Sequence, residues 1–164
     1  MAGKIIPIIG AAVAFGATTT AIYLQNAEQL IPCSLCVWQR LLFAIISGSF
    51  LITALLANTN WQQRVNVFTM ALSGGGLLVA GLHIWLQSNP HINASCGPSL
   101  EYLLENFSFF TAIKKFIASP GHCAEVSYTL GHLSLAEWAF ITFLLCALLS
   151  LLLLGWQKKS PHLS

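Results

Sequence analysis

Five cysteines are the residues of this 164-residue chain best suited to redox chemistry, and four of them fall into two pairs. Cys33 and Cys36 form a C-x-x-C motif, whereas Cys96 and Cys123 bracket a much longer segment. Cysteine pairs exchange electrons with other thiols through mixed disulfides. Zinc sites and structural disulfides use similar cysteine patterns, so spacing alone leaves thiol exchange, metal binding and cross-linking open.

A zinc site would need two more ligands beside the C-x-x-C pair, and Cys96, Cys123, His91 and His122 are the residues that could supply them. The wide separation of the two later cysteines, with no second close pair, counts against zinc, and no resident metal is expected. The fifth cysteine, Cys146, lies alone in an apolar stretch and is expected to be a small core residue.

The surroundings of Cys36 favour redox chemistry. Cys36 is expected at the start of a helix, where the helix dipole and unpaired N–H groups favour a thiolate. Arg40 follows at i+4 and therefore projects from the same helix face. A charge so close to hydrocarbon is costly and marks a functional site. The alternative, in which Arg40 reaches out to lipid headgroups, explains the tolerated charge but not its register with Cys36.

The composition indicates that these residues belong to a membrane protein. The chain is 56% hydrophobic and 7% charged, far from the balance of a soluble domain. A bilayer core about 30 Å thick needs about 20 mostly apolar residues per spanning helix. Four stretches qualify, at residues 5–24, 36–57, 65–87 and 135–155, with outer loops at 25–35 and 88–134. We therefore predict an all-α membrane protein whose single domain, residues 1–164, is a four-helix transmembrane bundle.

Charged residues indicate how the bundle is oriented. An even number of spans places both termini on one side, which carries only basic residues: Lys4, Arg64, Lys158 and Lys159. All five acids lie on the other side, together with three basic residues: Glu28, Glu101, Glu105, Glu125, Glu137, Arg40, Lys114 and Lys115. The positive-inside rule places both termini in the cytoplasm and the four paired cysteines on the outer side.

The second outer loop contains an amphipathic segment. From Leu100 onward one apolar face follows helical spacing: Leu103, Leu104, Phe107, Phe110, Ile113 and Ile117. The run Ser119-Pro120-Gly121 then ends the element. We expect a short helix that lies along the membrane surface. A helix packed only on the ends of the bundle would show nearly the same pattern.

Polar and small residues within the spans suggest further roles. His83, near the outer end of the third span, is placed to hydrogen-bond a quinone carbonyl or assist proton transfer, or simply to be a satisfied helix-end histidine. Close helix packing is the simplest reason for two groups of small residues: the three glycines at 74–76 with Ala80 and Gly81, and Gly10 with Ala14. No nucleotide-binding context surrounds the glycine run, and no nucleic acid partner is expected.

Taken together, these residues resemble a known family. The run Pro32-Cys33-Ser34-Leu35-Cys36-Val37-Trp38-Gln39-Arg40 resembles the signature of DsbB, the disulfide bond formation protein B family. In the second half, Gly121-His122-Cys123-Ala124-Glu125, then Leu130-Gly131 and Glu137-Trp138, are similar to that family's second periplasmic loop and its entry into the fourth helix. The resemblance covers nearly the whole chain.

The resemblance implies a role for each motif position. Cys33 and Cys36 would be the membrane-proximal redox pair, with Cys36 engaging a quinone, ubiquinone or menaquinone, beside Arg40. Cys96 and Cys123 would be the outer shuttle pair, with Cys96 forming the mixed disulfide with a DsbA-like periplasmic thiol oxidase.

His83 matches a quinone-proximal histidine of the family by its position alone, thirteen residues before Cys96. The implied function is an inner-membrane oxidoreductase that reoxidises the periplasmic oxidase and passes electrons to quinone, driving protein disulfide formation. Two alternatives stay open at this point. A vitamin K epoxide reductase-like enzyme does related chemistry, but keeps its quinone-reactive C-x-x-C late in the chain. A non-enzymatic four-span scaffold would carry inert disulfides.

Overall fold

A computed structural model of the chain describes residues 2–29, 33–56, 59–89, 100–118 and 129–159. Four long helices dominate it: α1 (Ala2–Ala27), α2 (Ser34–Leu55), α3 (Thr59–Ser88) and α6 (Leu135–Lys159). Two short helices, α4 (Leu100–Asn106) and α5 (Phe109–Ala118), and two short strands, β1 (Thr129–Leu130) and β2 (Leu133–Ser134), lie between α3 and α6. Cys96 and Cys123 lie outside the described residues.

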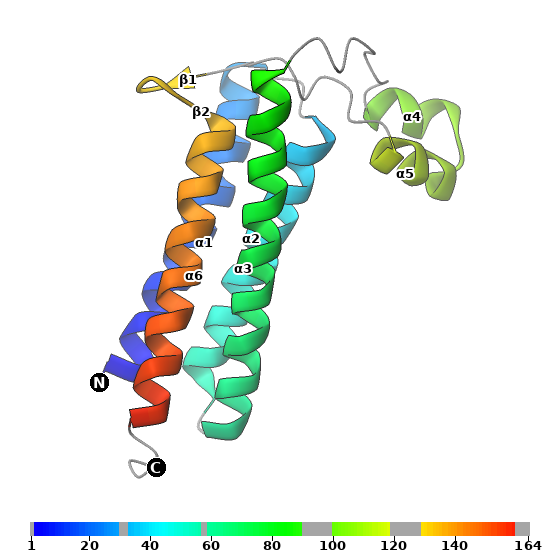
Figure 1. The fold of residues 1–164 in the computed structure, drawn as a ribbon. Helices are drawn as coiled ribbons and strands as arrows, with labels where there is room; N and C mark the ends of the chain where they lie inside the picture. The colour runs from blue at the N-terminus through cyan, green and yellow to red at the C-terminus, as the bar shows by residue number, and fades with distance from the viewer. Residues whose placement is uncertain (1, 30–32, 57–58, 90–99, 119–128, 160–164) are drawn as a thin grey trace.

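The four long helices pack side by side into one bundle (Figure 1). Each is long and apolar enough to cross a membrane. Helix α1 packs on α2 and α6, and α3 packs on α2 and α6. Large apolar side chains such as Phe15, Leu55 and Leu78 are exposed on the outside of the bundle, as expected of a surface that meets lipid. The predicted fold class, a four-helix transmembrane bundle, is confirmed.

The core of the bundle is built from aromatic rings set against small residues. Phe43 of α2 stacks on Phe143 of α6, with ring centroids 3.9 Å apart and planes 11° from parallel. Phe50 lies over Gly10 of α1, where an added Cβ would come within 2.7 Å of the ring. Phe143 also lies directly against Gly76 of α3. The absence of a side chain at these glycines lets neighbouring helices approach through an aromatic ring.

Replacing Gly76 by alanine is therefore expected to destabilise the bundle by roughly 1–3 kcal/mol, because the new methyl group overlaps the Phe143 ring in a close-packed core. The matched control is Gly75→Ala, whose added Cβ meets nothing within 4 Å. Thermal unfolding of both variants in detergent micelles measures the difference. Equal melting temperatures for the two variants would show that the Gly76–Phe143 contact contributes nothing.

The segment between α3 and α6 differs in detail from the sequence prediction. The single surface helix expected from Leu100 onward is divided into α4 and α5. The break follows Asn106, whose side-chain amide donates 2.9 Å to the Tyr102 carbonyl, a local bond that competes with helix continuation. The two short helices lie beside each other at the end of the bundle that holds the start of α2 (Figure 1). Their position at a membrane surface stays a prediction.

Strands β1 and β2 form a hairpin that was not predicted from the sequence. Thr129 pairs with Ser134 and Leu130 with Leu133 in an antiparallel register. The two turn residues, Gly131 and His132, both have positive φ, at 62° and 73°. A two-residue turn of this kind matches the natural twist of the paired strands. The hairpin leads directly into α6.

Candidate functional site

The C-x-x-C pair is held by the first turn of α2. Cys33 is the N-cap residue of this helix, with extended backbone angles, and its sulfur accepts a hydrogen bond of 3.3 Å from the Cys36 backbone N–H. Such a bond, at the positive end of a helix dipole, favours the thiolate form of a cysteine. The two sulfur atoms are 2.8 Å apart. Cys33 is buried and Cys36 is partly exposed, so the two thiols differ in access.

Arg40 lies one turn beyond Cys36 and is fixed to the last turns of α1. Its Nη1 donates to the side-chain oxygen of Gln25, and its Nη2 donates 3.2 Å to the carbonyl of Ala21. These contacts hold the guanidinium between two helices, where a charged group without partners would be costly. They favour a built site over an arginine that extends to lipid headgroups.

His83 belongs to α3 and contacts Cys33 of the C-x-x-C pair. Its Nε2 lies 3.7 Å from the Cys33 sulfur, and its Nδ1 lies 3.4 Å from the side-chain amide nitrogen of Gln39. All three side chains are buried. The side chains around the C-x-x-C pair therefore form one cluster, in which His83 contacts Cys33. Its members are Cys33, Cys36, Gln39, Arg40 and His83.

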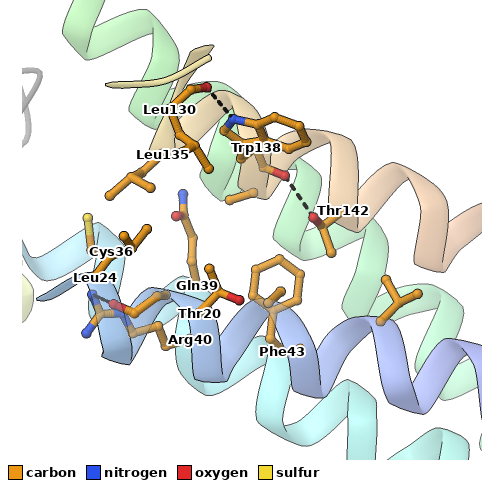
Figure 2. A pocket seen from close by; sticks show the side chains of 15 residues that line it. Thr20, Leu24, Cys36, Gln39, Arg40, Phe43, Leu130, Leu135, Trp138 and Thr142 are labelled. Carbon is orange, nitrogen blue, oxygen red and sulfur yellow. Dashed lines mark hydrogen bonds between the residues drawn. The ribbon is translucent and has the colours of Figure 1, made fainter. Parts of the chain in front are cut away.

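An apolar cavity of about 270 Å³ lies next to this cluster, between α1, α2 and the start of α6 (Figure 2). Cys36, Gln39 and Arg40 form its polar side. The other walls are mostly apolar: Val13, Gly16, Ala17, Thr20, Ala21, Leu24, Phe43, Leu130, Leu135, Trp138, Ala139 and Thr142. Cys33 and His83 are not among the lining residues, so only one sulfur of the pair borders the cavity.

The wall that faces α2 is held in place by the start of α6. Ser134 and Glu137 form a capping box, in which the Ser134 N–H donates 2.6 Å to the Glu137 carboxylate and the Glu137 N–H donates 3.3 Å to the Ser134 hydroxyl. The Trp138 indole N–H donates 2.9 Å to the Leu130 carbonyl (Figure 2). This bond ties the β1–β2 hairpin to α6, so Leu130 and Trp138 line the cavity together.

The cavity and the cluster fit a flat, apolar ring with hydrogen-bond acceptors. Ligand sites are typically apolar clefts with a few polar groups that fix orientation. Here the apolar walls suit a ring, the Arg40 guanidinium is a donor for a carbonyl oxygen, and Cys36 supplies a reactive sulfur at the same side. A four-span bundle in which one sulfur of a C-x-x-C pair borders such a cavity defines a membrane thiol–disulfide oxidoreductase.

The comparisons with known proteins agree with this class. The family model for disulfide bond formation protein DsbB matches residues 3–153. Two similar proteins are each named Disulfide bond formation protein B. The one from Nitrosococcus oceani is 34% identical, over 82% of this chain and 79% of the relative. The one from Xylella fastidiosa strain Temecula1 is 33% identical, over 91% of this chain and 88% of the relative. Another, from Hahella chejuensis, is 37% identical over 76% of each chain. The chain belongs to the DsbB family, which confirms the resemblance and makes it a disulfide-forming membrane oxidoreductase.

The structure adds residues that sequence reasoning missed. Gln25 accepts a hydrogen bond from Arg40, and Gln39 contacts His83. Trp138 supports the cavity wall through its hydrogen bond to Leu130. Gln39 carried a usable signal, because a polar side chain next to a charged one inside a span marks a functional site. Gln25 carried none, since its partner is fifteen residues away on another helix.

Proposed function

We propose that this protein reoxidises a DsbA-like thiol oxidase and passes the electrons through its two cysteine pairs to a membrane quinone, ubiquinone or menaquinone. The position of Cys36 carries the proposal. Its sulfur lies 2.8 Å from Cys33 and borders an apolar cavity beside Arg40. One cysteine can thus exchange disulfides with another protein segment while the other meets an apolar electron acceptor.

The outer half of the reaction is thiol exchange, assigned to Cys96 and Cys123 by the family motif. A thiolate of the reduced oxidase attacks Cys96 of the Cys96–Cys123 disulfide and forms a mixed disulfide. The second thiol of the oxidase then resolves the mixed disulfide and leaves Cys96 and Cys123 reduced. This dithiol exchanges in the same way with the Cys33–Cys36 disulfide. Each exchange breaks one S–S bond and forms another, and two electrons and two protons move inward.

The inner half of the reaction ends at the cavity. A bound quinone would supply the acceptor for the two electrons and two protons released when Cys33 and Cys36 form their disulfide. Cys36, Arg40 and the apolar walls, including Phe43 and Trp138, are the residues that would hold it. Arg40, fixed by α1, stabilises negative charge on the Cys36 thiolate.

His83 acts on the other cysteine of the pair in this proposal. Its Nε2 faces the Cys33 sulfur at 3.7 Å, so the imidazole can hydrogen-bond the sulfur in its thiol or thiolate form. Gln39 borders both the cavity and the imidazole and therefore links His83 to the cavity side. The sequence-based assignment of His83 to quinone binding stays a prediction, and its 3.7 Å contact with the Cys33 sulfur supports a role at that cysteine.

The orientation also belongs to the proposal. We place the protein in the bacterial inner membrane, with both termini in the cytoplasm and the C-x-x-C pair on the periplasmic side. Helix α1 begins and α6 ends at one end of the bundle, opposite the start of α2 (Figure 1). Helix α3 also begins at the end that carries the termini (Figure 1), and Arg64 belongs to its second turn. This arrangement agrees with the positive-inside rule.

The test is turnover with purified protein in detergent micelles, a reduced DsbA-like oxidase and ubiquinone. We expect one quinone to be reduced for each disulfide formed in the oxidase, measured by quinone absorbance and by thiol labelling. The Cys146→Ala variant should retain this activity, because Cys146 lies in the bundle core and away from the cavity. Oxidation of the partner without matching quinone consumption would overturn the proposal.

A further inference from the structure

Among the described residues, Cys33, Cys36 and His83 form a group whose ligand atoms all lie within 4.8 Å of one another. The group joins the start of α2 to α3. In a tetrahedral zinc site, Zn–S bonds of about 2.3 Å and Zn–N bonds of about 2.0 Å place two sulfurs about 3.8 Å apart and a sulfur and nitrogen about 3.5 Å apart. The Cys33–His83 spacing of 3.7 Å already matches, and the Cys36 sulfur needs to move by about 1 Å.

Two neighbouring contacts prepare these side chains for a metal. Metal-binding histidines usually have their second ring nitrogen held by a hydrogen-bond partner. Here the Gln39 side-chain amide lies 3.4 Å from Nδ1 of His83, and Nε2 faces Cys33. Metal binding by Nε2 requires the ring proton on Nδ1, and Gln39 accepts that proton's hydrogen bond once its amide turns its oxygen toward the ring. The Cys36 backbone N–H stabilises the Cys33 sulfur as a thiolate, the form that binds metals.

The charge balance also suits a buried site. Cys33 and His83 are only 6% and 3% exposed, so an unbalanced charge there would be costly. A divalent cation with two thiolates and a neutral imidazole has no net charge. Three protein ligands leave a fourth coordination position, as in many zinc sites that are not purely structural.

We propose that the reduced Cys33–Cys36 pair and His83 bind one zinc-class divalent cation, and that the bound cation stops turnover. Binding displaces the two thiol protons and moves no electrons. The oxidised pair has no thiolates to offer, so the cation binds only the reduced state. While bound, it occupies both sulfurs, and the disulfide cannot form until the cation leaves. From the sequence, the wide spacing of Cys96 and Cys123 counted against a zinc site completed by the second loop, whereas the structure brings His83 to the C-x-x-C pair.

The probe is Cd²⁺, whose bonds to thiolate absorb in the near ultraviolet. The protein carries Cys96→Ser, Cys123→Ser and Cys146→Ala, so that the C-x-x-C pair supplies the only thiols. We expect one Cd²⁺ per chain after reduction with a phosphine, competition by Zn²⁺, and no signal from the oxidised protein. His83→Gln removes a ligand and should weaken Cd²⁺ binding by at least about tenfold, the loss that removing even a ligand's hydrogen-bond partner causes. The control His132→Gln, at an exposed hairpin position, should not weaken it.

The proposal would be overturned if the His83→Gln variant bound Cd²⁺ as tightly as the protein with His83 and melted at the same temperature. The metal would then be bound by the two cysteines alone. Equal binding by the oxidised and reduced forms would overturn the proposal without any substitution at His83. In wild-type protein that has first been reduced, Zn²⁺ should slow the reduction of added quinone, and an unchanged rate would refute the inhibition. Because the cadmium experiment uses protein without the outer cysteine pair, its failure leaves the proposed electron transfer untouched.

Discussion

Replacing Cys36 by serine is expected to abolish quinone-dependent oxidation of the partner, with a fall in rate of at least about a thousandfold, because a serine hydroxyl cannot form a disulfide or pass electrons. Cys36 is the one sulfur of its pair that borders the cavity. The substitution replaces the sulfur by an oxygen and leaves the backbone N–H of residue 36, which donates to the Cys33 sulfur. The loss should therefore be chemical rather than structural.

Stopped-flow or steady-state loss of quinone absorbance measures this effect, with circular dichroism and melting temperature as checks on the fold. Cys146→Ala is the matched control, since it removes a thiol from the core of the same bundle. A Cys36→Ser variant that still reduces quinone at the wild-type rate would refute the assignment of Cys36.

Replacing Arg40 by alanine is expected to slow turnover by about 10–150-fold, the effect of losing about 1.5–3 kcal/mol of hydrogen bonding to a charged group. Arg40 donates to Gln25 and to the Ala21 carbonyl, so its guanidinium is fixed beside Cys36. Arg40→Lys should recover only part of the rate, because an ammonium group cannot reproduce the planar fork that contacts both acceptors.

The control for charge is Arg64→Ala, which removes an exposed arginine that lies over Trp61 near the start of α3. Its turnover should equal that of the wild type. Rates and quinone KM for the three variants separate binding from chemistry. An Arg40→Ala variant with unchanged kcat and KM would support the alternative that this arginine serves only the membrane interface.

The fold class could be predicted from composition because four apolar stretches of sufficient length leave few other structures in a bilayer. The small residues of the third span were also predicted to pack closely. Which glycine makes the contact depends on rotation of α3 about its axis, and only Gly76 faces Phe143 while Gly74 and Gly75 meet no neighbour. Sequence spacing alone does not fix that rotation.

The site could be predicted only where its partners are local in sequence. Cys33, Cys36 and Arg40 lie within two turns of one helix, so their spacing indicated a shared face. The contact between Cys33 and His83 joins residues fifty positions apart and depends on how α2 packs on α3. The cavity wall at Leu130 depends on a hairpin whose Gly131–His132 turn has no strong signal in the neighbouring sequence.

Cys33 and Cys36 occupy the N-cap and N3 positions of α2, the same two positions that Ser134 and Glu137 occupy in the capping box of α6. The C-x-x-C spacing is therefore also the spacing of a helix start signal. Serine is among the best N-cap residues, whereas alanine is among the poorer ones. A serine at position 33 thus removes the thiol and keeps the cap, while an alanine removes both. Chemistry and helix initiation, which share one side chain in this protein, can be separated by the choice of substitute.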